Sequence, residues 1–292
     1  MDEFGTDDHC RLVLEELRWQ GSPKCPRCDS DKLSRIAKRG QFDCDSCRYQ
    51  FSVTVGTVLH DSHLPLRKWF IAAFLMCESK KGISALQLQR TIGVSYKTAW
   101  YLTQRIRAAM FEANTAQLTG IVEADETYIG GKLRGFKSRK EASLARLKNK
   151  TVILGAVERG GRIRLRVAPN NRKGPIGAFL NEVVADEATA IYTDELKSYA
   201  KVGDSTTIHA SVNHKSEEWV RGEVHTNTVE GVWSLLDRAI IGSYHQLSKK
   251  HLPAYLGEFE WRFNNRDNAF LFRDTLNRLL EAETLPYKNL TA

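Results

Sequence analysis

Two pairs of cysteines near the N-terminus constrain the fold of this chain more than any other feature. Cys25 and Cys28 form one C-x2-C pair, Cys44 and Cys47 form a second, and the motif reads C-x2-C-x15-C-x2-C. Each pair turns two thiolates towards one point, and two pairs complete the tetrahedral set of four sulfur ligands that Zn²⁺ prefers. The spacing therefore predicts a zinc ribbon over 21–60, in which a structural zinc ion staples a fragment of ~35 residues that is too small for its own core.

Charge and hydropathy limit the partners and the compartment that we expect for the chain. The 292 residues carry a formal net charge of +8, which favours a polyanionic partner such as DNA. The longest apolar run, Trp69–Cys77, is about half of the ~20 residues that span a bilayer, and the acidic N-terminus lacks the features of a signal peptide. We therefore expect no membrane partner and a cytoplasmic, nucleoid-associated protein with reduced cysteines.

Changes in residue pattern divide the chain into four expected parts. A helix is predicted over 1–20, before the zinc ribbon at 21–60. Residues 61–115 have a helical pattern, and from Ile121 onwards strand-like and helical runs alternate. That alternation is typical of a mixed sheet with flanking helices. We therefore predict an α/β domain over 118–285.

A short turn at Gly93 separates two predicted helices in the helical part. Ser84 is placed to cap the first helix, and Ser95 begins the second. This outline is typical of a helix-turn-helix, whose second helix enters the major groove of DNA. An ordinary helical hairpin with a solvated basic face is the alternative. The residues expected to contact DNA from the second helix are Ser95, Lys97, Thr98 and Arg105.

Three acidic residues stand at positions where they could meet in the folded chain. Asp125 lies in one predicted strand, Asp194 ends another, and Glu230 lies near the start of a later helix. Two aspartates on neighbouring strands and a glutamate from a later helix can converge on one point and hold two Mg²⁺ or Mn²⁺ ions. Taken singly, each acid also has an ordinary explanation, as a turn cap, a helix cap or a surface charge.

The stretches around these acids closely resemble bacterial insertion-sequence transposases of the DDE class that carry an N-terminal zinc ribbon. The resemblance extends over nearly the whole chain, and its most specific stretches include EADETYIGGK (Glu123–Lys132), YTDELKSY (Tyr192–Tyr199) and HTNTVEGVWSLLDR (His225–Arg238). It implies an RNase H-like fold for the α/β domain. It also implies that Asp125 and Asp194 are the catalytic aspartates and that Glu230 is the third acid, with Mg²⁺ or Mn²⁺ between them.

The same resemblance implies a reaction and its partners. An enzyme of this kind binds the terminal inverted repeats of its element, cleaves a DNA strand at the end of the element and joins the freed strand to target DNA. Because two DNA ends must be paired, the resemblance further implies a homo-oligomer in the synaptic complex.

The third ligand position of the acidic site, which we call the third corner, has two candidates, Glu230 and Asn227. In this family an Asn can serve at the third position, and Asn227 lies three residues before Glu230, on the same helical face if the helix has already begun. His225 is a supporting candidate, because a histidine near a metal can orient a ligand or a phosphate. Trp233 has a plausible place beside the site, although a tryptophan here is more often part of the core.

One position departs from the family pattern. The family usually has a lysine seven residues after the third acid, and this chain has Asp237 there. A lysine would meet a DNA phosphate, whereas an aspartate would repel one. Either Arg238, Lys249 or Lys250 supplies the missing positive charge, or this copy is impaired.

A basic run between the predicted strands is expected to contact DNA. It spans 132–150 and includes Arg134 and Lys137, and a solvated loop is the alternative. Two rival functions stand beside the transposase. One is a catalytically impaired or domesticated DNA-binding protein, which tolerates Asp237. The other is a nuclease that cuts DNA but cannot join it, which the N-terminal DNA-reading modules disfavour.

Overall fold

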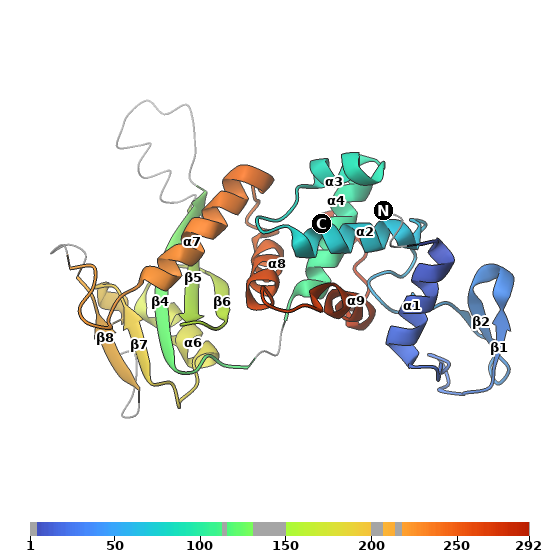
Figure 1. Cartoon of the computed structure of the whole chain (residues 1–292), viewed down its shortest axis with the longest axis horizontal. Helices are drawn as coiled ribbons and strands as arrows, with labels where there is room; N and C mark the ends of the chain where they lie inside the picture. Colours follow the sequence, from blue (N-terminus) through green and yellow to red (C-terminus); the bar gives the residue numbers. More distant parts are fainter. Residues whose placement is uncertain (1–4, 113–115, 131–149, 200–206, 214–217, 292) are drawn as a thin grey trace. The chain divides into compact units, whose positions relative to one another are not determined.

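The computed structural model describes residues 5–112, 116–130, 150–199, 207–213 and 218–291. The chain divides into two compact units (Figure 1). The first unit combines Met1–Phe111 with Arg266–Ala292, and the second is Glu112–Asn265. Among the described residues, no helix is both long enough and apolar enough to cross a membrane.

The first unit begins with helix α1 (Asp7–Trp19) and a small antiparallel sheet. Thr6 caps α1 by accepting a hydrogen bond from the backbone N–H of His9 at 3.2 Å. The sheet has the order β1-β2-β3, and its strands are β1 (Leu33–Ile36), β2 (Gln41–Cys44) and β3 (Gln50–Phe51). Trp19 lies edge-on to Phe42 with ring centroids 5.3 Å apart. The end of α1 thereby supplies much of the apolar contact that so short a sheet lacks.

Helices α2 (Leu66–Glu78), α3 (Ala85–Ile92) and α4 (Tyr96–Met110) follow the sheet. Ser84 caps α3, Gly93 ends that helix in the left-handed conformation at φ 62°, and Ser95 caps α4. The predicted caps and turn are therefore confirmed. Local chemistry sets these boundaries, because a serine hydroxyl satisfies a free N–H of the first turn and glycine adopts positive φ without strain.

Helix α9 (Leu271–Glu281) belongs to the first unit, with the short helix α10 (Tyr287–Thr291) after it. The sequence pattern places residues up to 285 in the α/β domain, whereas the compact second unit ends at Asn265. The reason is tertiary packing. Phe272 lies 5.9 Å from Phe70 and 5.7 Å from Phe74 by ring centroids, and Leu279 is fully buried. A helical pattern reveals an apolar face but not its partner.

The second unit is built on a five-stranded mixed sheet with the order β6-β5-β4-β7-β8. Its strands are β4 (Ile121–Gly130), β5 (Lys150–Glu158), β6 (Ile163–Ala168), β7 (Ala190–Thr193) and β8 (Ile208–Ser211). Strands β4, β5 and β6 pair antiparallel, whereas β7 pairs parallel with both β4 and β8. The central strand β4 therefore joins the antiparallel and parallel halves of the sheet.

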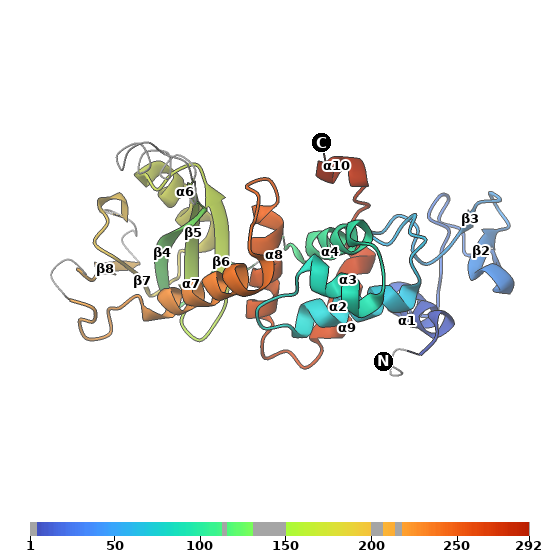
Figure 2. The same cartoon turned by 90° about the horizontal axis from the view of Figure 1, so that it is seen from above.

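Helices cover both faces of this sheet, as Figures 1 and 2 show. Helix α6 (Lys173–Val183) packs on the face that contains Val122 and Ala124. Helices α7 (Asn227–Ala239) and α8 (Leu252–Asn264) pack on the opposite face, which contains Ile153 and Val157. A mixed sheet with flanking helices confirms the predicted fold class.

We expect a fragment of Glu112–Asn265 to fold on its own, because its helices already cover both faces of the sheet. A fragment of 118–285 would expose the apolar face of α9, including Leu276 and Leu279, and we expect it to aggregate. Calorimetry and size-exclusion chromatography of the two fragments measure the difference. A monomeric, cooperative 118–285 fragment beside an unfolded 112–265 fragment would contradict this division.

Candidate active site and metal centres

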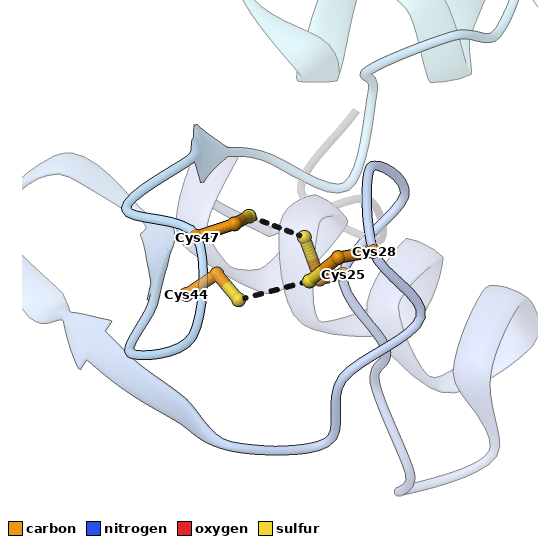
Figure 3. Close-up of side chains that lie close together, drawn as sticks. All are labelled: Cys25, Cys28, Cys44 and Cys47. Atoms are coloured by element: carbon orange, nitrogen blue, oxygen red, sulfur yellow. Dashed lines mark hydrogen bonds between the residues drawn. The ribbon is translucent and has the colours of Figure 1, made fainter.

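The four cysteines of the ribbon form a compact cluster of sulfur atoms (Figure 3). The Sγ atoms of Cys25 and Cys47 lie 3.6 Å apart, as do those of Cys28 and Cys44, and all four lie within 4.8 Å of one another. A tetrahedral zinc site with Zn–S bonds of about 2.3 Å requires sulfur–sulfur separations of about 3.8 Å. The predicted zinc ligands therefore fit a single Zn²⁺.

The two C-x2-C pairs use the same backbone turn. The N–H of Asp29 donates to the carbonyl of Cys25 at 2.9 Å, and the N–H of Arg48 donates to the carbonyl of Cys44 at 2.8 Å. Asp29 and Arg48 both adopt positive φ, at 57° and 56°. Each turn folds the chain back after its second cysteine and so aims both thiols of the pair inward.

Asp125 and Asp194 are brought together by the parallel pairing of β4 with β7. Ile121 pairs with Ala190 and Glu123 with Tyr192, so the offset between the strands is 190 − 121 = 69 residues. The two aspartates have the same separation, 194 − 125 = 69. The ladder ends at Glu123 and Tyr192, and the same offset continued by two residues leads to Asp125 in β4 and to Asp194 directly after β7. The two carboxylates are close enough to repel each other.

Negative charge is concentrated around Asp125. Burial raises the pKa of Asp125 to about 7, and repulsion from Glu126 and Asp194 acts in the same direction. The indole N–H of Trp233 donates to Asp125 Oδ2 at 2.8 Å and opposes the rise. A cation bound between these carboxylates would remove the repulsion, and hard carboxylate oxygens are the ligands that Mg²⁺ and Mn²⁺ prefer. The donor set therefore fits the expected divalent metal.

Gly155 on β5 makes room for the Trp233 ring. It is the cross-strand partner of Asp125, and a Cβ atom at this position would lie 2.3 Å from the Trp233 ring. Any larger residue would push the indole away from the Asp125 carboxylate. Trp233 is thus both a core residue, 8% exposed, and a direct partner of the candidate catalytic aspartate.

Glu126 is a further acidic residue at the site, and the sequence motifs alone did not single it out. Its carboxylate accepts hydrogen bonds from Asn171 Nδ2 and from the Tyr199 hydroxyl, both at 3.0 Å. Burial raises the pKa of Glu126, and Asp194 adds to the rise. The pKa of Tyr199 is also raised, first by burial and then by the neighbouring carboxylates. The available signal was the position directly after Asp125 in the sequence.

Neither candidate for the third corner, Glu230 or Asn227, forms a metal-binding cluster with the two aspartates. Glu230 lies in the first turn of α7, is exposed, and accepts a hydrogen bond from the Thr226 hydroxyl at 3.0 Å. Asn227, the first residue of α7, is also exposed. Within the described part of the chain, the four cysteines form the only group of three or more His, Cys, Asp or Glu side chains that could hold one metal ion.

Glu123 connects β4 to the N-terminus of α7. This fully buried carboxylate accepts from the backbone N–H groups of Thr228 and Val229 at 2.7 and 3.1 Å. It also pairs with Arg159 Nε at 2.7 Å. His225 Nδ1 lies 3.2 Å from Glu123, without hydrogen-bond geometry. The supporting residue predicted at 225 therefore lies next to Glu123. The sequence signal for Glu123 was its place two residues before Asp125, on the same face of the strand.

The predicted DNA-contacting residues of α4 differ in exposure. Ser95 and Lys97 are exposed, and Thr98 is half-buried. Arg105 is only 4% exposed, in contrast to the expectation. Its guanidinium donates to the His60 carbonyl at 2.6 Å and lies over the Trp69 ring. Arg105 therefore holds the interior of the first unit together and has no surface to offer DNA.

The other predicted DNA contacts lie in the second unit. Arg238 is exposed and donates to the Ser234 hydroxyl at 2.7 Å, and its neighbour Asp237 is exposed as well. Lys249 and Lys250 are exposed in the segment before α8. Arg134 and Lys137 lie outside the described residues.

Comparison with known proteins decides the family. A model described as the ISXO2-like transposase domain matches residues 117–264, and one described as the transposase zinc-ribbon domain matches residues 5–50. The chain belongs to the ISXO2-like transposase family. The first match spans the sheet, both aspartates and Glu230, and the second spans the cysteine cluster.

Relatives of this transposase family are similar over different lengths. An uncharacterized protein in the transposable element ISH50 of Halobacterium salinarum is 30% identical over 89% of this chain and 91% of its own length. An uncharacterized transposase-like protein of Haemophilus influenzae is 29% identical over 35% of this chain and 80% of its own length. A chain in the cryoEM structure of a simian T-cell lymphotropic virus intasome with a PP2A regulatory subunit aligns with a TM-score of 0.30 and 12% identity, covering 66% of this chain and 67% of its own. That likeness is too low to carry an argument.

Zinc should bind with one ion per chain, and Cys44→Ala should release it. Loss of the ion should also loosen the packing of Trp19 on Phe42, which near-ultraviolet circular dichroism reports. Cys10→Ala is the matched control, because Cys10 is equally buried but lies outside the cluster. Full zinc content in Cys44→Ala, measured by chelator titration, would exclude this site.

Without divalent metal, Asp125 should make the protein less stable as pH rises. Its folded pKa of about 7 exceeds the ordinary value of 3.8, so the native state binds the proton more tightly than the unfolded state. The free energy of unfolding should therefore fall between pH ~4 and ~7, by at most about 1.4 kcal/mol per pH unit. Asp125→Asn should flatten this slope and raise the melting temperature at pH 8.

Thermal unfolding in EDTA at pH 5 and pH 8 measures the effect. Asp237→Asn is the control, because Asp237 is exposed. An equal pH slope in wild type and Asp125→Asn would show that the aspartate does not carry the effect.

Proposed function

We propose that this chain is the DNA transposase of an insertion sequence. It binds the terminal inverted repeats of the element, cleaves one strand at the element's end, and joins the freed 3′-hydroxyl to target DNA. The observation that carries the proposal is the parallel register of β4 with β7, which leads towards Asp125 in β4 and Asp194 directly after β7, within the region that the ISXO2-like transposase model matches.

Different side chains would have different roles in this reaction. Asp125 and Asp194 would hold Mg²⁺ or Mn²⁺, and either Glu230 or Asn227 would complete the site. A divalent metal held there would supply Lewis-acid chemistry, activation of the attacking oxygen and stabilisation of the leaving oxygen of the phosphodiester. Trp233 orients the Asp125 carboxylate through its indole N–H and excludes water from that side. Because phosphoryl transfer depends on position and charge more than on covalent catalysis, this rigid support is central.

The first unit would supply DNA recognition. Helices α3 and α4, with the turn at Gly93, have the outline of a helix-turn-helix, and Ser95, Lys97 and Thr98 lie at the start of α4. We assign these residues to the inverted repeat, and we remove Arg105 from the set because it is buried. The protein would act on the nucleoid in the cytoplasm, as a homo-oligomer that pairs two element ends.

A second candidate function is a DNA-binding protein that has lost catalysis. The exposed Asp237, in the last turn of α7, favours this candidate because it repels a phosphate backbone. Such a protein would bind one inverted-repeat sequence in a salt-sensitive way and would not nick DNA in Mg²⁺ or Mn²⁺.

Strand cleavage of a duplex that carries the element's own inverted repeat tests the proposal. Wild type should cleave in Mg²⁺ or Mn²⁺ and join the product to a target plasmid, whereas Asp125→Asn and Asp194→Asn should lose at least ~10³-fold in rate, because each removes a metal ligand. Asp237→Asn should keep activity and bind DNA at least as tightly as wild type.

Each outcome has a separate meaning. Undiminished metal-dependent cleavage by Asp125→Asn would falsify the assignment of the site. Specific binding without cleavage by wild type would favour the DNA-binding candidate, and cleavage without joining would favour a nuclease.

A further inference from the structure

We infer that Glu123 is a positioning residue for the cleavage reaction, because its carboxylate fixes the first turn of α7 against the strand that carries Asp125. That turn contains both candidates for the third corner, Asn227 and Glu230. The inference rests on the proposed function and names what holds the third corner in place.

The hydrogen bonds of Glu123 leave it no role as a metal ligand. Oε1 accepts from Arg159 Nε at 2.7 Å and from the Thr228 hydroxyl at 2.8 Å. Oε2 accepts from the backbone N–H groups of Thr228 and Val229 at 2.7 and 3.1 Å. An ionised carboxylate offers about four acceptor sites, and four donors occupy them here. Glu123 therefore acts through the groups that it binds.

Helix α7 needs this partner because its own N-cap residue does not cap it. The Thr226 side chain makes no capping bond and donates to Glu230 at 3.0 Å instead. The first-turn N–H groups of a helix have no partner within the helix, and a negative charge there is favourable for the helix dipole. Glu123 meets both requirements from a strand more than 100 residues away in the sequence.

A second contact fixes the position of α7 along β4. Trp233 donates to Asp125 at 2.8 Å, just as Thr228 and Val229 donate to Glu123. Two residues along a strand span about 6.6 Å, and four residues along a helix span about 6 Å. The two contacts therefore match in spacing, and a slide of α7 along β4 would break both.

Arg159 extends this support to the other aspartate. Its guanidinium pairs with Glu123 and also donates to the His225 carbonyl, at 3.2 Å, in the segment that leads into α7. It lies 5.0 Å from the centroid of the Tyr192 ring, two residues before Asp194. The pair of Glu123 and Arg159 thus contacts each of the three elements that carry the candidate site: β4, β7 and the start of α7.

Glu123→Gln tests the inference, with Glu258→Gln as the matched control. Each Glu123 oxygen accepts hydrogen bonds from two donors. A glutamine at this position would replace one of these oxygens with an NH2 group, which is itself a donor and would face donors. Glu258 is also a fully buried glutamate; it accepts from the Tyr244 hydroxyl at 2.8 Å and lies 3.4 Å from Arg262, but it is on α8. Glu123→Gln should lower kcat for strand cleavage at least tenfold, with KM for the DNA unchanged. Glu258→Gln should keep kcat within about twofold of wild type.

A double-mutant cycle and hydrogen exchange separate positioning from general loss of stability. If Glu123 acts through the third corner, Glu123→Gln should cost little further kcat in a background that already carries Glu230→Gln or Asn227→Ala, whichever of the two lowers kcat to a rate that is still measurable. The amides of residues 228–230 should exchange at least tenfold faster in Glu123→Gln and unchanged in Glu258→Gln. If Glu123→Gln does not fold, Thr228→Val replaces it in these experiments. Thr228→Val removes one donor and leaves the carboxylate charged, so it should show the same pattern more weakly.

Equal loss of kcat in Glu123→Gln and Glu258→Gln, or fully additive losses in the cycle, would overturn the inference. Unchanged exchange at residues 228–230 would overturn it as well, and that result does not depend on catalysis. Absence of cleavage by wild type would instead count against the proposed function.

Discussion

The ion pair between the fully buried carboxylate of Glu123 and the partly exposed guanidinium of Arg159 is the interaction on which the second unit depends. A buried charge is costly unless it is paired and its lone pairs are satisfied. Here helix amides, a threonine hydroxyl and a backbone carbonyl supply the partners. These partners come from separate elements. The pair therefore connects the antiparallel strands, the parallel strands and α7 at one point beside the acidic site.

Features set by neighbouring residues could be predicted from the sequence. The spacing of the cysteines was sufficient for the metal cluster, because each C-x2-C pair folds by its own turn. The caps at Ser84 and Ser95 were predictable for the same reason. The proximity of the two aspartates was predictable because a parallel register relates residues by one constant offset, whereas their catalytic role stays a prediction.

Features set by distant residues could not be predicted in this way. Arg105 is a basic residue on the helix expected to contact DNA, yet its guanidinium lies over the Trp69 ring of α2 and the Tyr101 ring one turn earlier on α4. The apolar face of α9 indicated burial without indicating which unit would bury it. Glu123 looked like one more acid in a strand, since its donors lie 36 and more than 100 residues further along the chain. The third corner stays a prediction for the same reason: Glu230 and Asn227 share one helix turn, and sequence spacing does not rank them.

The division of the chain has a consequence for its synthesis. The first unit is completed by α9, which packs on helices made before the whole second unit. On the ribosome, the apolar faces of α2 and α4 must wait while about 150 intervening residues emerge, and domains that have left the ribosome generally fold as units. The second unit can therefore mature first. A chain that terminates before α9 would carry a finished second unit and an incomplete first unit, whose uncovered apolar faces expose it to chaperones and proteases.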